Sequence, residues 1–111
     1  MRHRIIAALT LTLSLPTLAA TPLKVETIVE GLSAPWAFDF LPDGRILVTE
    51  RAGRLRVIEN GSLQEAPIAG VPTVHHAGQG GLLDVLIDRD FATTQRLFLS
   101  FAHRDRGGNA T

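Results

Sequence analysis

The stretch of this chain with the greatest capacity for chemistry is residues 75–84, which read His-His-Ala-Gly-Gln-Gly-Gly-Leu-Leu-Asp. Glycines surround Gln79, and an apolar run follows directly. Glycine permits positive φ angles and lets the backbone approach a ligand or a neighbouring strand closely. An amide side chain offers two donors and an acceptor without a charge. The pattern predicts a tight turn that presents Gln79 at the start of a strand.

The residues alone leave more than one role open for this turn. Gln79 either contacts a ligand or hydrogen-bonds the backbone of its own turn. His75 and His76 are adjacent, so on an extended strand they would point to opposite faces, and no third ligand at a useful spacing completes a metal site. We expect both histidines to be exposed or hydrogen-bonded loop residues. His76 borders the glycine turn and is the weaker candidate for a cofactor contact.

The elements that must position the turn are short strands. Apolar residues alternate with polar ones in segments of about six residues, separated by Gly, Pro, Asn and Asp, which is the pattern of half-buried strands joined by turns. Asn60-Gly61 is a strong hairpin signal, and Pro42-Asp43-Gly44 has the residues of a tight turn. The predicted strands are residues 24–30, 36–41, 45–50, 54–59, 82–87 and 96–102, with 82–87 expected to be buried on both faces.

Strands at this spacing predict an all-β antiparallel meander. Four-stranded antiparallel units that repeat along a chain build β-propellers, and this chain supplies one such unit and part of the next. A sandwich or barrel usually needs seven or more strands. We therefore interpret residues 21–111 as the amino-terminal, incomplete part of a propeller, with a complete small domain as the alternative.

Residues 1–20 have the pattern of a secretory signal peptide. Arg2 and Arg4 precede an apolar run over residues 5–15, and Ala19 and Ala20 provide small residues at cleavage spacing. The run is too short to span a bilayer, which needs about 20 apolar residues. We expect cleavage after Ala19 or Ala20 and a periplasmic or secreted mature protein with no membrane span.

Composition narrows the partners further. Without Arg2 and Arg4, nine basic residues face eleven acidic ones, which gives a net charge of −2. No basic patch gathers on a predicted face, so nucleic acid is not an expected partner. The chain has no cysteine, so an exported domain of this kind must be held by its apolar core rather than by disulfides.

Several phrases of the chain resemble the soluble glucose/sorbosone dehydrogenases, the PQQ-dependent aldose sugar dehydrogenase family. The resemblance covers most of residues 25–102. It rests first on Pro35-Trp36-Ala37 followed by Phe40-Leu41-Pro42-Asp43-Gly44-Arg45. It rests further on Val48-Thr49-Glu50-Arg51 and on the glycine cluster around Gln79 with Leu82-Leu83-Asp84-Val85.

The resemblance implies a six-bladed β-propeller that binds pyrroloquinoline quinone (PQQ) and calcium. The implied reaction oxidises an aldose at its anomeric carbon to the lactone, with hydride transfer to PQQ and electrons passed on to an external acceptor. Gln79 lies at the position of the family's active-site glutamine, which hydrogen-bonds at the quinone and the substrate. The family's general-base histidine sits in a Gly-Asn-His motif that this chain lacks, and calcium ligands are expected beyond Thr111. The 111-residue chain alone is expected to be inactive.

Other interpretations stay open beside the enzyme. A non-catalytic propeller that binds sugar, peptide or protein would share the Leu-Pro-Asp-Gly turn, and a translated product of a decayed gene would be unstable. Among single features, turn capping is favoured over calcium binding for Asp84, Asp88 and Asp90. Packing between blades is favoured over sugar stacking for Trp36, Phe38 and Phe40, and a solvated face is expected for Arg51, Arg54 and Arg56.

Overall fold

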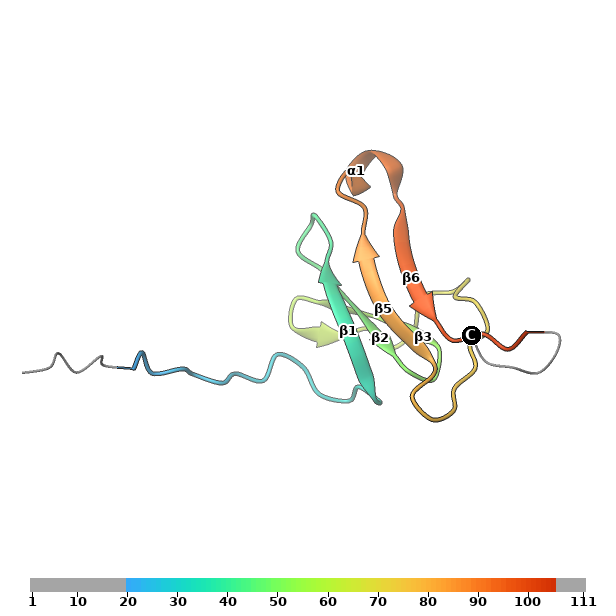
Figure 1. Cartoon of the computed structure of the whole chain (residues 1–111). Coiled ribbons are helices and arrows are strands. Elements are labelled where there is room, and N and C mark those ends of the chain that lie inside the picture. Colours follow the sequence, from blue (N-terminus) through green and yellow to red (C-terminus); the bar gives the residue numbers. More distant parts are fainter. Residues whose placement is uncertain (1–19, 106–111) are drawn as a thin grey trace, which may run out of the picture.

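The computed structural model describes residues 20–105, so nearly all of the signal peptide predicted at residues 1–20 lies outside the described range. The described part is built from strands, with one short helix (Figure 1). In chain order these elements are β1 (Pro35–Phe40), β2 (Ile46–Glu50), β3 (Arg54–Glu59), β4 (Ser62–Leu63), β5 (Leu82–Ile87), α1 (Phe91–Thr94) and β6 (Leu97–Phe101).

The strands form two antiparallel sheets. β1, β2, β3 and β4 make a four-stranded sheet in sequence order, and β5 pairs with β6 in a second sheet. In Figure 1, β1 and β5 lie beside each other and run in the same direction, so both begin at the same end of the molecule. A complete four-stranded meander followed by the first strands of another is the arrangement of consecutive propeller blades, as predicted.

The turns between strands follow from the residues at them. Asn60 and Gly61 adopt φ angles of 51° and 73°, which a two-residue type I′ hairpin requires and which Asn-Gly provides at low cost. Between β1 and β2, the Gly44 N–H donates to the Leu41 carbonyl at 2.9 Å, and the Asp43 carboxylate accepts the Arg45 N–H at 3.1 Å. Both predicted turns are therefore confirmed.

Alternation along the strands places one apolar face of the first sheet against the second sheet. The buried side chains that meet there are Leu41, Leu47, Leu55 and Val85. Leu41, Leu47 and Leu55 come from the faces that sequence alternation assigned to them, because successive strand residues point to opposite sides, whereas alternation assigned Val85 to neither face. The contact between the two sheets is therefore an ordinary hydrophobic core.

Polar side chains also join the two sheets. Asp39 accepts the Ile87 N–H at 2.7 Å. Thr49, which is fully buried, donates its hydroxyl to the Leu83 carbonyl at 2.5 Å and accepts the Ala37 N–H at 3.1 Å. Ala37 lies where the pairing of β1 with β2 shifts register. The Thr49 hydroxyl therefore accepts the Ala37 N–H at this irregularity in the sheet. These bonds fix how β5 sits against β1.

Two strand predictions are wrong. Residues 24–30 form no strand, because β propensity reflects packing against cross-strand neighbours and burial, and Val25 is 94% exposed. β5 is buried on one face, not both: Leu86 is 59% exposed and Asp84 is exposed as well. In residues 20–105 nothing covers the second face of that sheet.

Candidate functional site

The glycine cluster forms the predicted tight turn just before β5. The Gly80 N–H donates to the Ala77 carbonyl at 2.8 Å, which closes a four-residue turn with Gly78 and Gln79 at its centre. Gly78 has a φ of 55°, the positive value that the first central position of a type I′ or II′ turn demands. The turn thus places Gln79 at its tip.

The next two glycines are required by close backbone approach. A Cβ atom on Gly81 would lie 2.2 Å from the Arg51 carbonyl oxygen, and Gly81 has a φ of +144°. A Cβ on Gly80 would lie 2.9 Å from the His75 carbonyl oxygen. Only glycine fits both positions without moving the backbone. This confirms the predicted reason for the cluster and anchors the turn to the end of β2.

Arg51 holds the turn from the first sheet. Its Nη2 atom donates to the carbonyls of Gly78 and Gly80, at 3.0 Å for Gly80. These residues flank Gln79 on either side. The guanidinium carbon also lies 5.8 Å from the ring centroid of Trp36, within the range of a cation–π contact. Residues at the starts of β1 and β5 and at the end of β2 therefore converge on one place.

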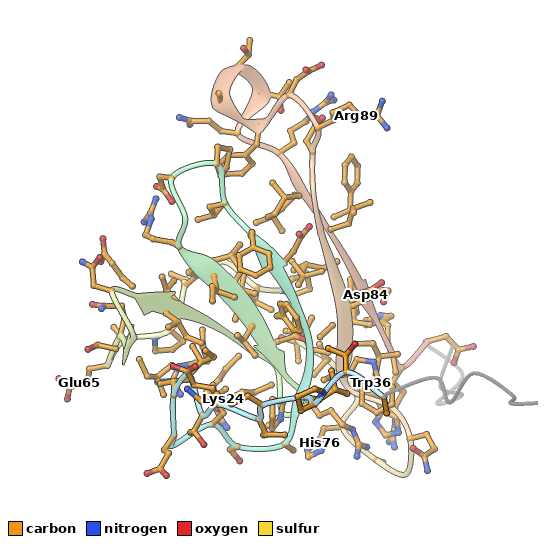
Figure 2. The ribbon with its side chains drawn as sticks, turned by 90° about the vertical axis from the view of Figure 1, so that its left-hand side faces the viewer. Lys24, Trp36, Glu65, His76, Asp84 and Arg89 are labelled. Carbon is orange, nitrogen blue, oxygen red and sulfur yellow. The ribbon has the colours of Figure 1, made fainter. Side chains whose placement is uncertain are left out.

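The predicted site residues lie close together in this turn. Gln79 is exposed, and its amide has no hydrogen-bond partner among residues 20–105. His76 is exposed too, and Figure 2 shows it at the same end of the molecule as Trp36 and opposite Arg89. His75 is half-buried, and its backbone N–H donates to the Ala102 carbonyl at 2.7 Å. The ligand contacts predicted for Gln79 and His76 stay predictions.

The predicted solvated face of arginines is wrong. Arg54 Nε donates to the Glu50 carboxylate at 2.5 Å, and Arg56 Nη1 lies 3.4 Å from it. Glu50 is fully buried, and its Oε1 also accepts the Ser33 N–H at 2.6 Å. Burial raises the pKa of the Glu50 carboxyl. The Ser33 N–H and the two guanidinium groups lower the pKa by more than burial raises it, so the pKa lies below its ordinary value. These arginines neutralise a buried charge beside the site.

Sequence reasoning missed Arg51 and Glu50 as parts of the site. Arg51 meets carbonyls that are 27 and 29 residues away in the chain, and no local spacing marks such a contact. The available signal was position, since Glu50 ends a strand and Arg51 begins the turn that follows it. The contacts of these two residues become visible only in the folded structure.

Turn capping, predicted for Asp84, Asp88 and Asp90, is confirmed for Asp88 alone among the three. Asp88 accepts the Asp90 N–H at 3.1 Å, the Thr94 hydroxyl at 2.9 Å and Arg96 Nε at 3.1 Å. These contacts, led by the Asp90 N–H, hold the pKa of Asp88 below its usual value. The prediction is wrong for the other two: Asp84 lies within β5, where its carboxylate accepts the N–H of the neighbouring Val85 at 2.9 Å, and Asp90 makes no side-chain cap bond at the start of α1. Across residues 20–105 no group of three His, Cys, Asp or Glu side chains is arranged to hold a metal ion.

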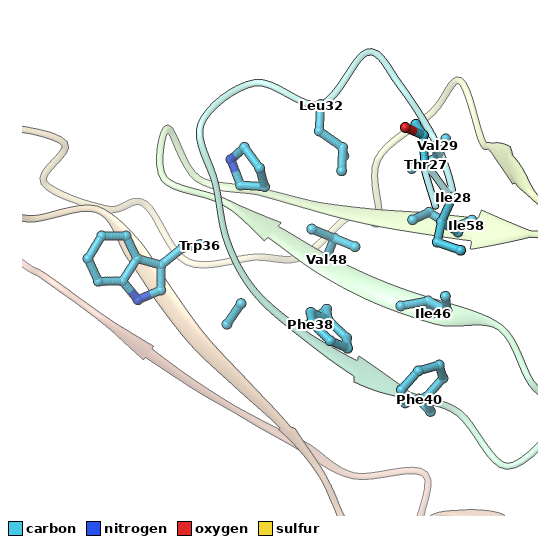
Figure 3. Close-up of a pocket in the computed structure, with 12 residues that line it drawn as sticks. Thr27, Ile28, Val29, Leu32, Trp36, Phe38, Phe40, Ile46, Val48 and Ile58 are labelled. Atoms are coloured by element: carbon cyan, nitrogen blue, oxygen red, sulfur yellow. The ribbon is translucent and has the colours of Figure 1, made fainter. Parts of the chain in front are cut away.

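The outer face of the first sheet is apolar and lines a groove of about 520 Å³. Trp36, Phe38 and Phe40 are each at least half exposed, and Figure 3 shows them across from the segment that carries Ile28 and Leu32. The predicted alternation is thus confirmed, but no second blade covers this face within residues 20–105, so its packing between blades stays a prediction. In the same range no helix has the length and apolarity to cross a bilayer.

Comparison with known proteins gives this fold and site a family. The family model described as Glucose / Sorbosone dehydrogenase matches residues 32–111. The chain is 43% identical over 93 residues to the aldose sugar dehydrogenase YliI of Escherichia coli, which covers 83% of this chain and 25% of that protein. The chain therefore spans about a quarter of the length of this curated relative.

Solved structures agree in fold. The soluble aldose sugar dehydrogenase from Escherichia coli in its apo-form superposes with a TM-score of 0.71 at 44% identity, covering 77% of this chain and 25% of that one. The PQQ-bound aldose sugar dehydrogenase from Streptomyces coelicolor superposes with a TM-score of 0.63 at 24% identity, covering 78% of this chain and 29% of that one. The match of the family model over most of the sequence, together with the aligned relatives, shows that the chain belongs to the glucose/sorbosone dehydrogenase family.

Proposed function

We propose that this chain is part of an exported quinoprotein that oxidises aldose sugars at the anomeric carbon to lactones. Its support is family membership, together with a relative named as an aldose sugar dehydrogenase and a solved family structure described as PQQ-bound. The observation in this chain that carries the proposal is the exposed Gln79 amide, which has no partner among residues 20–105 and sits in a turn held on both sides by Arg51.

The residues of the turn suit a quinone cofactor. Gln79 presents a neutral donor and acceptor, which can hydrogen-bond a quinone carbonyl in either redox state. A carboxylate at the same place would repel an anionic cofactor. The Arg51 guanidinium places a cationic group next to the turn. When bound, PQQ would supply the two-electron acceptor for the hydride that leaves the anomeric carbon.

The chain's own residues would therefore orient and polarise rather than exchange protons. The anomeric hydroxyl proton must go to a base, and the family's Gly-Asn-His motif is absent from this sequence. A donor aimed at a position of developing charge accelerates a reaction without itself reacting, and this is the role proposed for Gln79. His76, on the other side of Gly78, is the weaker candidate for a cofactor contact.

Calcium, an external electron acceptor and periplasmic location belong to the same proposal. The calcium ligands are expected beyond Thr111. Within residues 20–105 no group of three His, Cys, Asp or Glu side chains is arranged to hold a metal ion. Export rests on the signal-like residues 1–20.

The test uses the purified full-length protein. Apo-protein is incubated with PQQ and calcium, then given glucose and other aldoses with an artificial electron-accepting dye, and the lactone product is measured. We expect dye reduction and lactone formation in equal amounts, both dependent on PQQ. The matched control is the same protein without PQQ. If no aldose reduces the dye after PQQ loading, the protein is a non-catalytic propeller and the proposal is wrong.

A further inference from the structure

The Arg51 guanidinium contacts both peptide carbonyls that bracket Gln79. One nitrogen, Nη2, donates to Gly78 on one side of the glutamine and to Gly80 on the other, at 3.0 Å for Gly80. The two carbonyls belong to a turn that is rich in glycine. Its backbone is flexible, because glycine has more accessible backbone conformations than any other residue. A bridge across the turn therefore restricts where the Gln79 side chain can point.

Arg51 is itself fixed in place by contacts of its backbone and its side chain. Its N–H donates to the Ala34 carbonyl at 3.1 Å, and its own carbonyl accepts the Leu82 N–H at 3.0 Å. Leu82 is fully buried, so that bond is shielded from water. The guanidinium also lies over Trp36 at 5.8 Å. The bridge is thus anchored to β1, β2 and β5 together.

Arginine is the side chain suited to this position. Its planar guanidinium carries several donors in a fixed geometry, whereas lysine has a compact ammonium on a flexible stem. Gln79 makes no hydrogen bond to residues 20–105, so its direction depends on the backbone of the turn. The side chain of Arg51 holds that backbone together with the bond from the Gly80 N–H to the Ala77 carbonyl.

We propose that Arg51 is a positioning residue that acts through Gln79, holding the turn so that the amide points at the bound quinone and sugar. The inference rests on the proposed function, since it names the device that aims the predicted active-site amide. A purely structural Arg51 would stabilise the fold equally whether or not residue 79 is glutamine. If Arg51 positions Gln79, replacing Arg51 should lower kcat only in a protein that has the Gln79 amide.

That difference defines a double-mutant cycle in the full-length protein, with Arg51→Met, Gln79→Ala and the pair. Turnover of an aldose is measured with PQQ loaded, and the Kd of the apo-protein for PQQ is measured by calorimetry. We expect Arg51→Met to lower kcat about tenfold, because small displacements of an aligned group cost rates of this order, and to weaken PQQ binding. In the Gln79→Ala background the same change should leave kcat unaltered, since coupled residues are not additive.

Two further variants keep the test decisive. Arg51→Lys retains the charge and one donor direction, and we expect about a threefold loss of kcat that is again absent beside Gln79→Ala. It replaces Arg51→Met if that variant does not melt cooperatively. Arg45→Met is the control, since Arg45 pairs with Asp43 at the β1–β2 turn, and it should leave kcat and Kd unchanged.

The outcomes separate the two proposals. If wild-type protein neither binds PQQ nor oxidises any aldose, the proposed function is wrong and the role of Arg51 falls with it. If the wild type is active but Arg51→Met lowers kcat by the same factor with and without Gln79, Arg51 only stabilises the fold and this inference alone is overturned.

Discussion

Gly81→Ala should destabilise the protein more than any other glycine-to-alanine change at a turn of the described chain. The new Cβ would lie 2.2 Å from the Arg51 carbonyl oxygen, whereas ordinary contacts begin at 3.4 Å. Relief needs a displacement of about 1.2 Å, which would stretch the 3.0 Å bond from the Leu82 N–H to that carbonyl beyond hydrogen-bonding range.

The cost of Gly81→Ala has two parts. A buried N–H left without a partner costs about 1–3 kcal/mol, and Leu82 is fully buried. A non-glycine residue at positive φ costs about 1–2 kcal/mol. Together they give about 2–5 kcal/mol, a large part of the ~5–15 kcal/mol that stabilises a typical domain.

Gly44→Ala is the matched control for this change. Gly44 has a φ of +90°, but a Cβ there would meet nothing within 4 Å, so only the conformational cost of about 1–2 kcal/mol applies. The assay is thermal unfolding of the full-length protein, followed by near-ultraviolet circular dichroism. We expect Gly81→Ala to lower the Tm about twice as far as Gly44→Ala. Equal shifts would refute the close-approach argument.

Two further substitutions test the contacts around the site. Thr49→Val keeps the shape of a fully buried side chain but leaves the Ala37 N–H and the Leu83 carbonyl without their hydroxyl partner, at about 1–3 kcal/mol per group. Thermal unfolding should show a larger loss than for Thr49→Ser, which keeps the hydroxyl, and a smaller loss would contradict the bridging role. Glu50→Gln should make the Tm fall less steeply as the pH is lowered. The pKa of Glu50 in the folded protein lies below its ordinary value of 4.5. The ionised carboxylate therefore stabilises the fold above pH 4.5, and this stabilisation is lost as the pH falls through the folded pKa. Unchanged acid dependence in the Glu50→Gln variant would remove this residue from the titration.

Local residue chemistry was sufficient to predict much of the fold. Asn60-Gly61 and Pro42-Asp43-Gly44 determine their turns through φ preferences that need no tertiary partner. Alternation assigned Leu47 and Thr49 to one face of β2 and Val48 to the other, because strand geometry has a fixed period of two residues. Neighbouring residues alone were enough for these features.

What the sequence did not reveal depends on distant partners. The β-prone segment 24–30 pairs with no strand in residues 20–105, so propensity alone misassigned it. The sequence predicts a solvated face for Arg51 and assigns no role to Glu50. In the structure, Arg51 donates to carbonyls of the glycine turn, and Glu50 is buried and accepts the Ser33 N–H. The position of Gln79 in a glycine turn could be predicted, but the arginine that holds this turn could not.

The central claim is that the amide at the tip of the glycine turn works on the sugar and the quinone. Replacing Gln79 by alanine in the full-length, PQQ-loaded protein should lower kcat for aldose oxidation by about 10²-fold, the effect of losing one aimed donor. Gln64→Ala, at an exposed position after β4, should match wild type. A kcat for Gln79→Ala within about a factor of three of wild type, where ~10²-fold is expected, would contradict the account.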